Sequence, residues 1–174
     1  MNKMKLLKSS THPDTPTART NGFTRHASRA IVLRGADILL LYTARYHDYS
    51  LPGGGIDEGE DEVAGLIREL REETGAQNIS NIEPFGLYEE FRPWYKEDFD
   101  FVHMLSYCYV CEIDAELLSP EFEQHEIQNG MTPIWKNIHQ AIAHNEETIA
   151  KSPKKGMSIE RETFLLKLII ERLL

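Results

Sequence analysis

The chain has 174 residues, 41% of them hydrophobic, and its 28 acidic and 19 basic side chains give a formal net charge of −9. This length suits one domain with a sizeable core, and the apolar content excludes wholesale disorder. The acidic balance disfavours nonspecific binding to nucleic acid or to an anionic membrane, so an anionic substrate would need a local attraction such as a bound divalent cation.

Residues 1–22 are polar and include Pro13, Pro16 and several Ser and Thr residues. We expect them to form a flexible or irregular N-terminal arm before a domain over residues 23–174. No apolar run exceeds five residues, as in residues 38–42, which is too short for a signal peptide or a membrane span. The expectation is a cytoplasmic protein that has no membrane partner.

Two β-rich stretches, RAIVL and ILLLYTA, lie on either side of residues 35–37 and predict a β-hairpin. A helix is predicted over residues 61–74, because four apolar residues recur at i, i+3, i+4 and i+7: Val63, Leu66, Ile67 and Leu70. Asp61 suits the N-cap of this helix, and Gly75 stands where a C-cap glycine belongs.

The second half of the chain also alternates between strands and helices. We expect strands over residues 79–91 and 100–113, an acidic loop over 118–130, a short strand over 133–135, and helices over about 137–150 and from 158 to the C-terminus. Strands interleaved with three helices predict an α/β sandwich around a mixed β-sheet.

Cys108 and Cys111 have C-x-x-C spacing, which invites a redox or zinc interpretation. However, a zinc site needs four ligands, and redox pairs usually lie at a helix N-terminus. The two thiols instead lie in the strand-like run MLSYCYVCEI, where residues three apart point to opposite faces of a sheet. The prediction is two reduced cysteines in or near a core, which fits the cytoplasm.

The run SLPGGGIDEGE, residues 50–60, cannot lie inside a helix or a central strand, because glycine and proline destabilise both. In the helix that follows, Glu69, Glu72 and Glu73 share one face, and like charges at these spacings repel. A solvated acidic face is one interpretation. The other is a site for Mg²⁺ or Mn²⁺, since these ions prefer oxygen ligands and a glycine loop allows close approach of the backbone.

The pattern from Gly54 to Ala76 reads G-x5-E-x7-R-E-L-x-E-E-x-G-A, and it resembles the Nudix box of the Nudix hydrolases. Every specified position matches, although a residue larger than Ala76 is more usual at the last one. The preceding LPG is similar to the family's usual lead-in. The resemblance implies a Nudix-type α/β/α sandwich with a mixed β-sheet over roughly residues 25–174.

The resemblance also implies a metal site within the box. Glu72 and Glu73 would be direct ligands of Mg²⁺, with Mn²⁺ as a substitute. Glu69 would be a further ligand or the base that activates water, and the carbonyl group of Gly53 would complete the metal shell. The family's reaction is hydrolysis of a nucleoside diphosphate linked to another group.

Other residues of the box have supporting roles in this resemblance. Arg68 would orient the glutamates from behind, and Glu60 would tie the loop to the helix. The backbone of Gly54 and Gly55 would lie against the bound substrate.

Three residues outside the box are further candidates. His47 comes just before the glycine loop, and Arg92 combines a cation with neighbouring aromatic residues, so both suit contact with a substrate. The family often takes another catalytic acid from a later loop, and we favour Glu126 for this role, with Glu123 second. An ordinary surface or packing role is the alternative for each residue.

We therefore expect a Mg²⁺-dependent pyrophosphohydrolase that acts on a small phosphorylated metabolite or nucleotide. Nucleoside triphosphates, ADP-ribose-like compounds and nucleotide sugars remain as substrate classes. A nucleic-acid partner is not expected, because no basic RNA-binding patch is visible. The alternative function is a non-catalytic Nudix domain that senses a ligand, and a homodimer is left open.

Overall fold

The computed structural model describes residues 4–174. Its strands are β1 (Leu6–Thr11), β2 (Gly22–Ile31), β3 (Leu33–Arg34), β4 (Asp37–Thr43), β5 (Asp48–Ser50), β6 (Gly53–Gly55), β7 (Ser80–Pro93), β8 (Phe101–Glu112) and β9 (Met131–Asn137). Its helices are α1 (Glu62–Thr74), α2 (Gln124–Asn129), α3 (Ile138–Lys151) and α4 (Ile159–Leu173). Within residues 4–174, no helix is long and apolar enough to cross a membrane.

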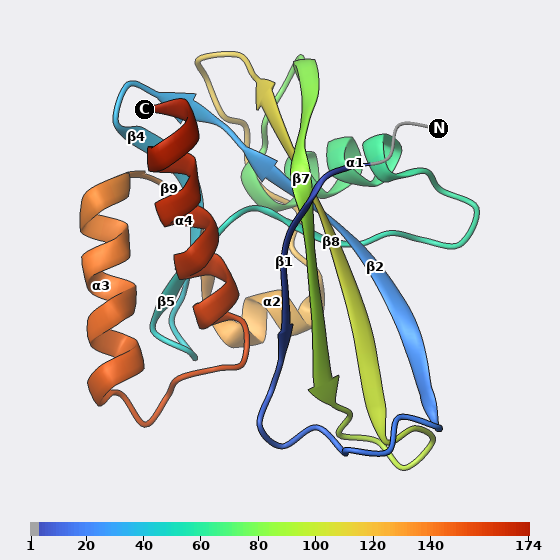
Figure 1. Cartoon of the computed structure of the whole chain (residues 1–174). Coiled ribbons are helices and arrows are strands. Elements are labelled where there is room, and N and C mark those ends of the chain that lie inside the picture. Colours follow the sequence, from blue (N-terminus) through green and yellow to red (C-terminus); the bar gives the residue numbers. More distant parts are fainter. Residues whose placement is uncertain (1–3) are drawn as a thin grey trace.

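The strands form two sheets (Figure 1). The five-stranded sheet has the order β1-β7-β8-β2-β6, in which β1 is parallel to β7 and β2 is parallel to β8, whereas the other pairs are antiparallel. In the second sheet, β3, β5 and β9 all pair with β4 in antiparallel fashion. The short strand β6 carries the glycine loop and lies at the edge of the five-stranded sheet, beside β2.

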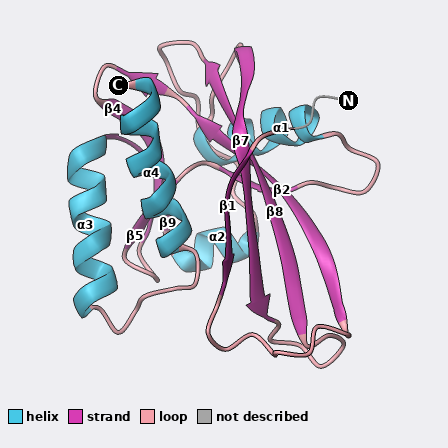
Figure 2. Cartoon of the chain, viewed as in Figure 1, coloured by secondary structure: helices cyan, strands magenta, loops and turns pink. Residues whose placement is uncertain are grey.

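Helices cover both faces of the strands (Figure 2). One buried hydrophobic cluster joins the strands to α3 and α4, and a second joins them to α1. In β2, Ile31 belongs to the first cluster and Ala30 to the second, because successive strand residues point to opposite faces. Leu40 and Leu39 of β4 divide in the same way. The predicted α/β sandwich with a mixed sheet and flanking helices is confirmed.

The caps of α1 are those expected from the sequence. The side chain of Asp61 accepts a hydrogen bond from the backbone N–H of Ala64 at 2.7 Å. Gly75 adopts the left-handed conformation, with φ of 74°, and a Cβ atom there would lie 1.8 Å from the carbonyl oxygen of Leu118. Glycine is therefore needed at this helix end both for its conformation and for the close passage of another segment.

The N-terminal arm is a correction. The prediction of a flexible or irregular arm over residues 1–22 is wrong for Leu6–Thr11, which form β1 and pair with β7. This strand satisfies backbone groups along the edge of β7, and Leu7 packs against the cluster beneath α3 and α4. Residues 12–21 have no regular structure, and residues 1–3 lie outside the described part of the chain.

Two further expectations differ from the structure. Most of RAIVL belongs to β2 in the five-stranded sheet, so the hairpin at residues 35–37 is short and joins β3 to β4. The expected loop over residues 118–130 contains α2. This helix is stabilised at its start by a hydrogen bond of 2.9 Å from the N–H of Glu123 to Oε1 of Glu126. It ends at Gly130, which has φ of 70°.

Candidate functional site

Three buried carboxyl groups from two helices meet at one point. Glu69 and Glu73 come from α1 and Glu126 from α2, and one oxygen atom of each lies within 4.8 Å of the others. Their relative exposures are only 8%, 2% and 7%. We call this group the acidic cluster. It unites two glutamates of the box with the loop residue that was favoured from the sequence.

The glycine loop, which we define as residues 50–60, packs directly against the acidic cluster. A Cβ atom on Gly54 would lie 2.9 Å from the carboxylate of Glu69, and a Cβ atom on Gly53 would lie 2.0 Å from the carbonyl oxygen of Ser28. Gly53 also has φ of 147°. Its N–H donates a hydrogen bond of 2.6 Å to Oε1 of Glu73. The bare backbone of this loop therefore fixes the acidic cluster from one side.

The electrostatics of the acidic cluster favour a bound cation. Burial raises the pKa of Glu69, and burial together with Glu126 and Glu69 raises the pKa of Glu73 well above its ordinary value. Carboxylates at this spacing repel one another when ionised, and a cation among them would relieve the repulsion. The donors are all carboxylate oxygens, which suits Mg²⁺ or Mn²⁺. The residues present thus fit the metal that the box implies.

Arg68 connects the glycine loop to α1. Its guanidinium group donates to Glu60 at 2.8 and 3.0 Å, to the carbonyl oxygen of Gly55 at 3.0 Å and to Oε1 of Glu69 at 3.0 Å. Hydrogen bonds from Arg68 and from the backbone of Asp57 lower the pKa of Glu60 to about 2. These contacts are compatible with the roles that the resemblance implies for Arg68, which would orient the glutamates, and for Glu60, which would tie the loop to the helix.

Glu72 lies outside the acidic cluster. Its side chain is 31% exposed and approaches Arg68 at 3.4 Å. Burial raises the pKa of Glu72, although Arg68 opposes this shift. The structure therefore groups Glu69 and Glu73 with Glu126, whereas the role of Glu72 as a direct metal ligand stays a prediction.

The acidic cluster opens into a cavity of about 410 Å³, which we call the main cavity. One part of its wall is the backbone of Gly53, Gly54 and Gly55. Another part carries charged residues that the sequence analysis did not select: Arg25, Arg29, Asp48, Arg161 and Glu162. Burial, followed by the charge of Glu162, raises the pKa of Asp48 to about 7. The main cavity thus has an acidic part and a part rich in arginine.

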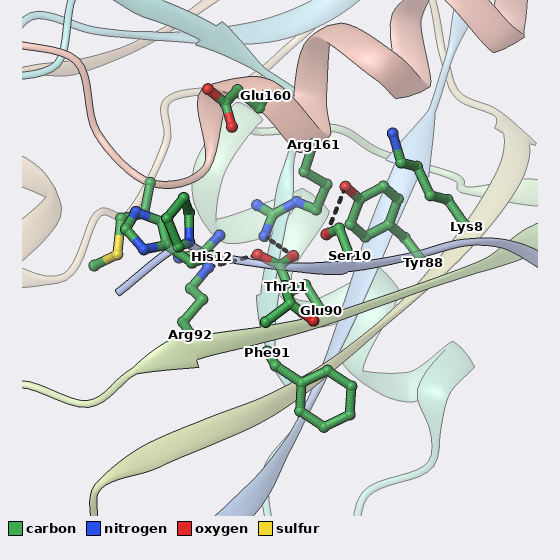
Figure 3. Close-up of a pocket in the computed structure, with 12 residues that line it drawn as sticks. Lys8, Ser10, Thr11, His12, Tyr88, Glu90, Phe91, Arg92, Glu160 and Arg161 are labelled. Atoms are coloured by element: carbon green, nitrogen blue, oxygen red, sulfur yellow. Dashed lines mark hydrogen bonds and ion pairs between the residues drawn. The ribbon is translucent and has the colours of Figure 1, made fainter. Parts of the chain in front are cut away.

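His47 and Arg92 do not line the main cavity. Nδ1 of His47 lies 2.6 Å from the hydroxyl oxygen of Tyr42, and its ring contacts that of His144 beside a separate cavity of about 260 Å³. Arg92 pairs with Glu90 (Figure 3). It also donates to the hydroxyl oxygen of Ser158 at 3.0 Å. It lines a smaller cavity of about 120 Å³. The predicted contact of either residue with the substrate gains no geometric support here.

A sequence signal for the arginine part of the main cavity existed. Arg29 lies on a face of β2 that also carries Ala27 and Ile31, both of them buried. Arg161 and Glu162 stand in the first turn of an amphipathic helix, and their exposures are 3% and 1%. A charged residue at a position that periodicity assigns to the core is unusual and points to a site.

Comparisons with known proteins agree with this geometry. A family model described as the NUDIX domain matches residues 24–156. The RNA pyrophosphohydrolase of Bartonella quintana (strain Toulouse) is 44% identical over 57 residues, which cover 33% of this chain and 30% of the relative. The 8-oxo-(d)GTP phosphatase of Mycolicibacterium smegmatis is 44% identical over 39 residues, which cover 22% and 12%. The chain thus spans less than a third of the length of these curated relatives.

Solved structures share the fold. The MutT protein from Bacillus halodurans superposes with a TM-score of 0.57 at 19% identity, over 82% of this chain and 80% of that one. A NUDIX hydrolase from Nitrosomonas europaea gives a TM-score of 0.56 at 15% identity, over 85% and 90%. Because the family model matches most of the chain and the fold agrees, the protein belongs to the NUDIX domain family.

Proposed function

We propose that this protein is a Mg²⁺-dependent pyrophosphohydrolase that cleaves a phosphoanhydride bond in a nucleoside diphosphate linked to another group. The observation that carries the proposal is the acidic cluster, buried at the glycine loop and open to the main cavity. Buried carboxyl groups destabilise a fold unless they are paired or bind a cation. A binding function therefore accounts for their presence better than a structural one does.

The side chains around the acidic cluster have distinct tasks in this reaction. When bound, the divalent cation would neutralise the diphosphate and lower the pKa of the attacking water. Arg68 holds Glu69, and the N–H of Gly53 holds Glu73, so both carboxylates are positioned before substrate binds. Glu126 approaches from a different helix and takes the proton of the attacking water, while the bond from phosphorus to the bridging oxygen breaks.

A small nucleotide is the proposed substrate. The names of the curated relatives support a phosphoanhydride substrate, since one is an RNA pyrophosphohydrolase and the other an 8-oxo-(d)GTP phosphatase. A cavity of about 410 Å³ suits a nucleotide-sized ligand. The net charge of −9 disfavours extended contact with an RNA backbone. Nucleoside triphosphates, ADP-ribose-like compounds and nucleotide sugars are the classes to compare.

The test is a phosphate-release screen with Mg²⁺ over these three classes and a 5′-triphosphorylated RNA oligonucleotide. We expect metal-dependent turnover of a small nucleotide, and Glu73→Gln should lower it by at least 100-fold with the fold intact. Glu171→Gln, which neutralises an exposed glutamate on α4, is the matched control and should leave turnover unchanged. Binding of a nucleotide without any cleavage would indicate a ligand-sensing domain instead.

A further inference from the structure

The part of the main cavity that is rich in arginine contains a cation, Arg29, that forms no ion pair with the residues that the structure describes. Nε of Arg29 is buried and makes no hydrogen bond to any residue of the described part, 4–174. The arginine ion pairs found within residues 4–174 involve Arg68, Arg92 and Arg161, but not Arg29. Burial and then the charge of Arg161 lower the pKa of Arg29, and the opposing charges of Glu162 and Glu90 do not reverse this shift, so the fold disfavours its positive charge. An unpaired cation that lines a cavity is suited to bind an anion.

The residues behind Arg29 do not neutralise it. Nη1 of Arg161 donates to Glu90 at 2.8 Å, and Glu90 also pairs with Arg92, so one carboxylate serves two arginines (Figure 3). Nε of Arg161 has no hydrogen-bond partner and lies 3.5 Å from Oε2 of Glu162. Counting Arg29, Arg92 and Arg161 against Glu90 and Glu162 leaves one positive charge in excess while Asp48 is protonated, as it is below its pKa of about 7.

Two acids that line the main cavity, Glu162 and Asp48, are the candidates to pair with Arg29. Oε1 of Glu162 accepts a hydrogen bond of 3.0 Å from the N–H of Leu51, and its Oε2 is buried without a hydrogen bond. Asp48, whose pKa is raised to about 7, makes no ion pair within residues 4–174. Neither carboxylate forms an ion pair with Arg29, which lines the main cavity.

Strand pairing places Arg29 next to the catalytic machinery. In the ladder between β2 and β6, Arg29 is the partner of Gly53, whose N–H holds Glu73 of the acidic cluster. Arg25, four residues before Arg29, lies on the same face of β2 and has its guanidinium group over Gly55. An anion that reaches from the acidic cluster along the glycine loop therefore passes Arg29. The start of α4 at Ser158 also lines the cavity, and the positive end of a helix favours an anion.

We propose that Arg29, with Arg161 behind it, forms a phosphoryl-binding subsite that holds a phosphate group of the substrate beside the group bound at the acidic cluster. The planar guanidinium group can bind two phosphate oxygens at once. This inference depends on the proposed function for the identity of the substrate. Binding of a phosphate to the subsite itself needs neither metal nor turnover, so it can be measured separately.

In the first experiment, inorganic pyrophosphate is titrated into the 174-residue protein in EDTA, and its binding is measured by calorimetry and by thermal melting. The wild type should bind pyrophosphate, and bound pyrophosphate should raise its melting temperature above that of the free protein. Arg29→Met should weaken binding at least tenfold, because the cation is lost. Its melting temperature without ligand should stay equal or rise, because the change removes an unpaired buried charge. Arg172→Met, at the exposed end of α4, is the control and should bind as the wild type does.

Pyrophosphate affinity of Arg29→Met equal to that of the wild type overturns the proposal. If Arg29→Met does not fold, Arg29→Gln replaces it, and the same comparison of affinities decides. A melting temperature lowered by several degrees, with pyrophosphate affinity retained, identifies Arg29 as a structural residue and also overturns the proposal.

The second experiment uses whichever nucleotide the phosphate-release screen identifies. Arg29→Met should raise KM at least tenfold, whereas Mn²⁺ affinity, measured by electron paramagnetic resonance without substrate, should not change. If no nucleotide is cleaved but pyrophosphate binding depends on Arg29, the proposed function fails and the subsite stands. If nucleotides are cleaved and Arg29→Met keeps both KM and pyrophosphate affinity, the subsite fails and the proposed function stands.

Discussion

The carboxyl group of Glu126 takes part in a helix cap and in the acidic cluster. Its Oε1 accepts a hydrogen bond from the N–H of Glu123 and so stabilises the start of α2. One of its oxygens also lies within 4.8 Å of the oxygens of Glu69 and Glu73. Glutamine keeps an acceptor oxygen and loses the charge, so this substitution separates the helix cap from the proposed chemistry.

Glu126→Gln should keep the fold and lose activity. We expect a melting temperature equal to or above that of the wild type, because a charge leaves a buried group of carboxylates. Metal-dependent turnover should fall by about 10²-fold or more, as when a positioned proton acceptor is removed. Turnover and Mg²⁺ affinity would be measured together, with Glu121→Gln on the neighbouring loop as the control. Normal turnover would move the proposed base to α1, with Glu69 as the candidate.

At the scale of elements, the glycine loop is held by side chains from two helices on opposite faces of the strands. Glu73 of α1 accepts from the N–H of Gly53, and Glu162 of α4 accepts from the N–H of Leu51. Arg68 adds a third link, from α1 to the carbonyl oxygen of Gly55. The loop is therefore positioned by the sandwich as a whole and not by local turn chemistry alone.

Arg68→Lys tests this attachment. A lysine keeps the charge but cannot reach Glu60, Glu69 and the backbone together, since it lacks the planar fork of arginine. We expect turnover to fall tenfold or more and the free energy of unfolding to fall by about 1 kcal/mol, because the site is partly exposed. Arg71→Lys, on the exposed side of the same helix, is the control. Wild-type turnover in Arg68→Lys would contradict the orienting role.

A helix or strand could be predicted from the sequence when the residues that stabilise it lie close to it in the chain. The start, end and apolar stripe of α1 follow from Asp61, Gly75 and helical spacing, and all lie within one stretch of sequence. By contrast, β1 is stabilised by pairing with β7, about 80 residues away, and its side chains are mostly exposed. The N-cap of α2 is Glu123, and glutamate is not among the preferred N-cap residues.

The same distinction applies to the candidate site. The spacing of the box selected Glu69, Glu72 and Glu73 because one helix carries all three, and the structure places Glu69 and Glu73 in the acidic cluster but not Glu72. Whether His47 or Arg92 reaches the main cavity depends on how α3 and α4 pack against the strands, and no local pattern records that packing. Glu126, which a family expectation favoured as a catalytic acid, lies in the acidic cluster, whereas the helix that positions it was not predicted.

At the scale of the whole molecule, one buried acid couples stability to pH. Burial raises the pKa of Asp48 from 3.8 to about 7. The folded state therefore binds a proton that the unfolded state releases between these two pH values. Stability should fall as pH rises from about 4 to 7, and the full loss is present above pH 7.

Asp48→Asn should abolish this part of the pH dependence, because asparagine imitates the neutral acid. We expect the substitution to raise the free energy of unfolding by about 3 kcal/mol at pH 8 and to have little effect at pH 4. Urea denaturation in EDTA at several pH values would measure it. Asp37→Asn, at an exposed position of β4, serves as the control. Equal effects of Asp48→Asn at both pH values would contradict the assignment.

The two buried thiols of β8, Cys108 and Cys111, can show by their alkylation rates which part of the fold opens first. Burial raises the pKa of Cys108 to about 12 and that of Cys111 to about 11, so neither reacts readily with an alkylating reagent while the fold is closed. Cys108 faces the cluster under α3 and α4, whereas Cys111 faces the one under α1. The relative labelling rates of the two residues should therefore reveal which helical layer separates first from the strands, and whether a bound nucleotide slows one layer or both.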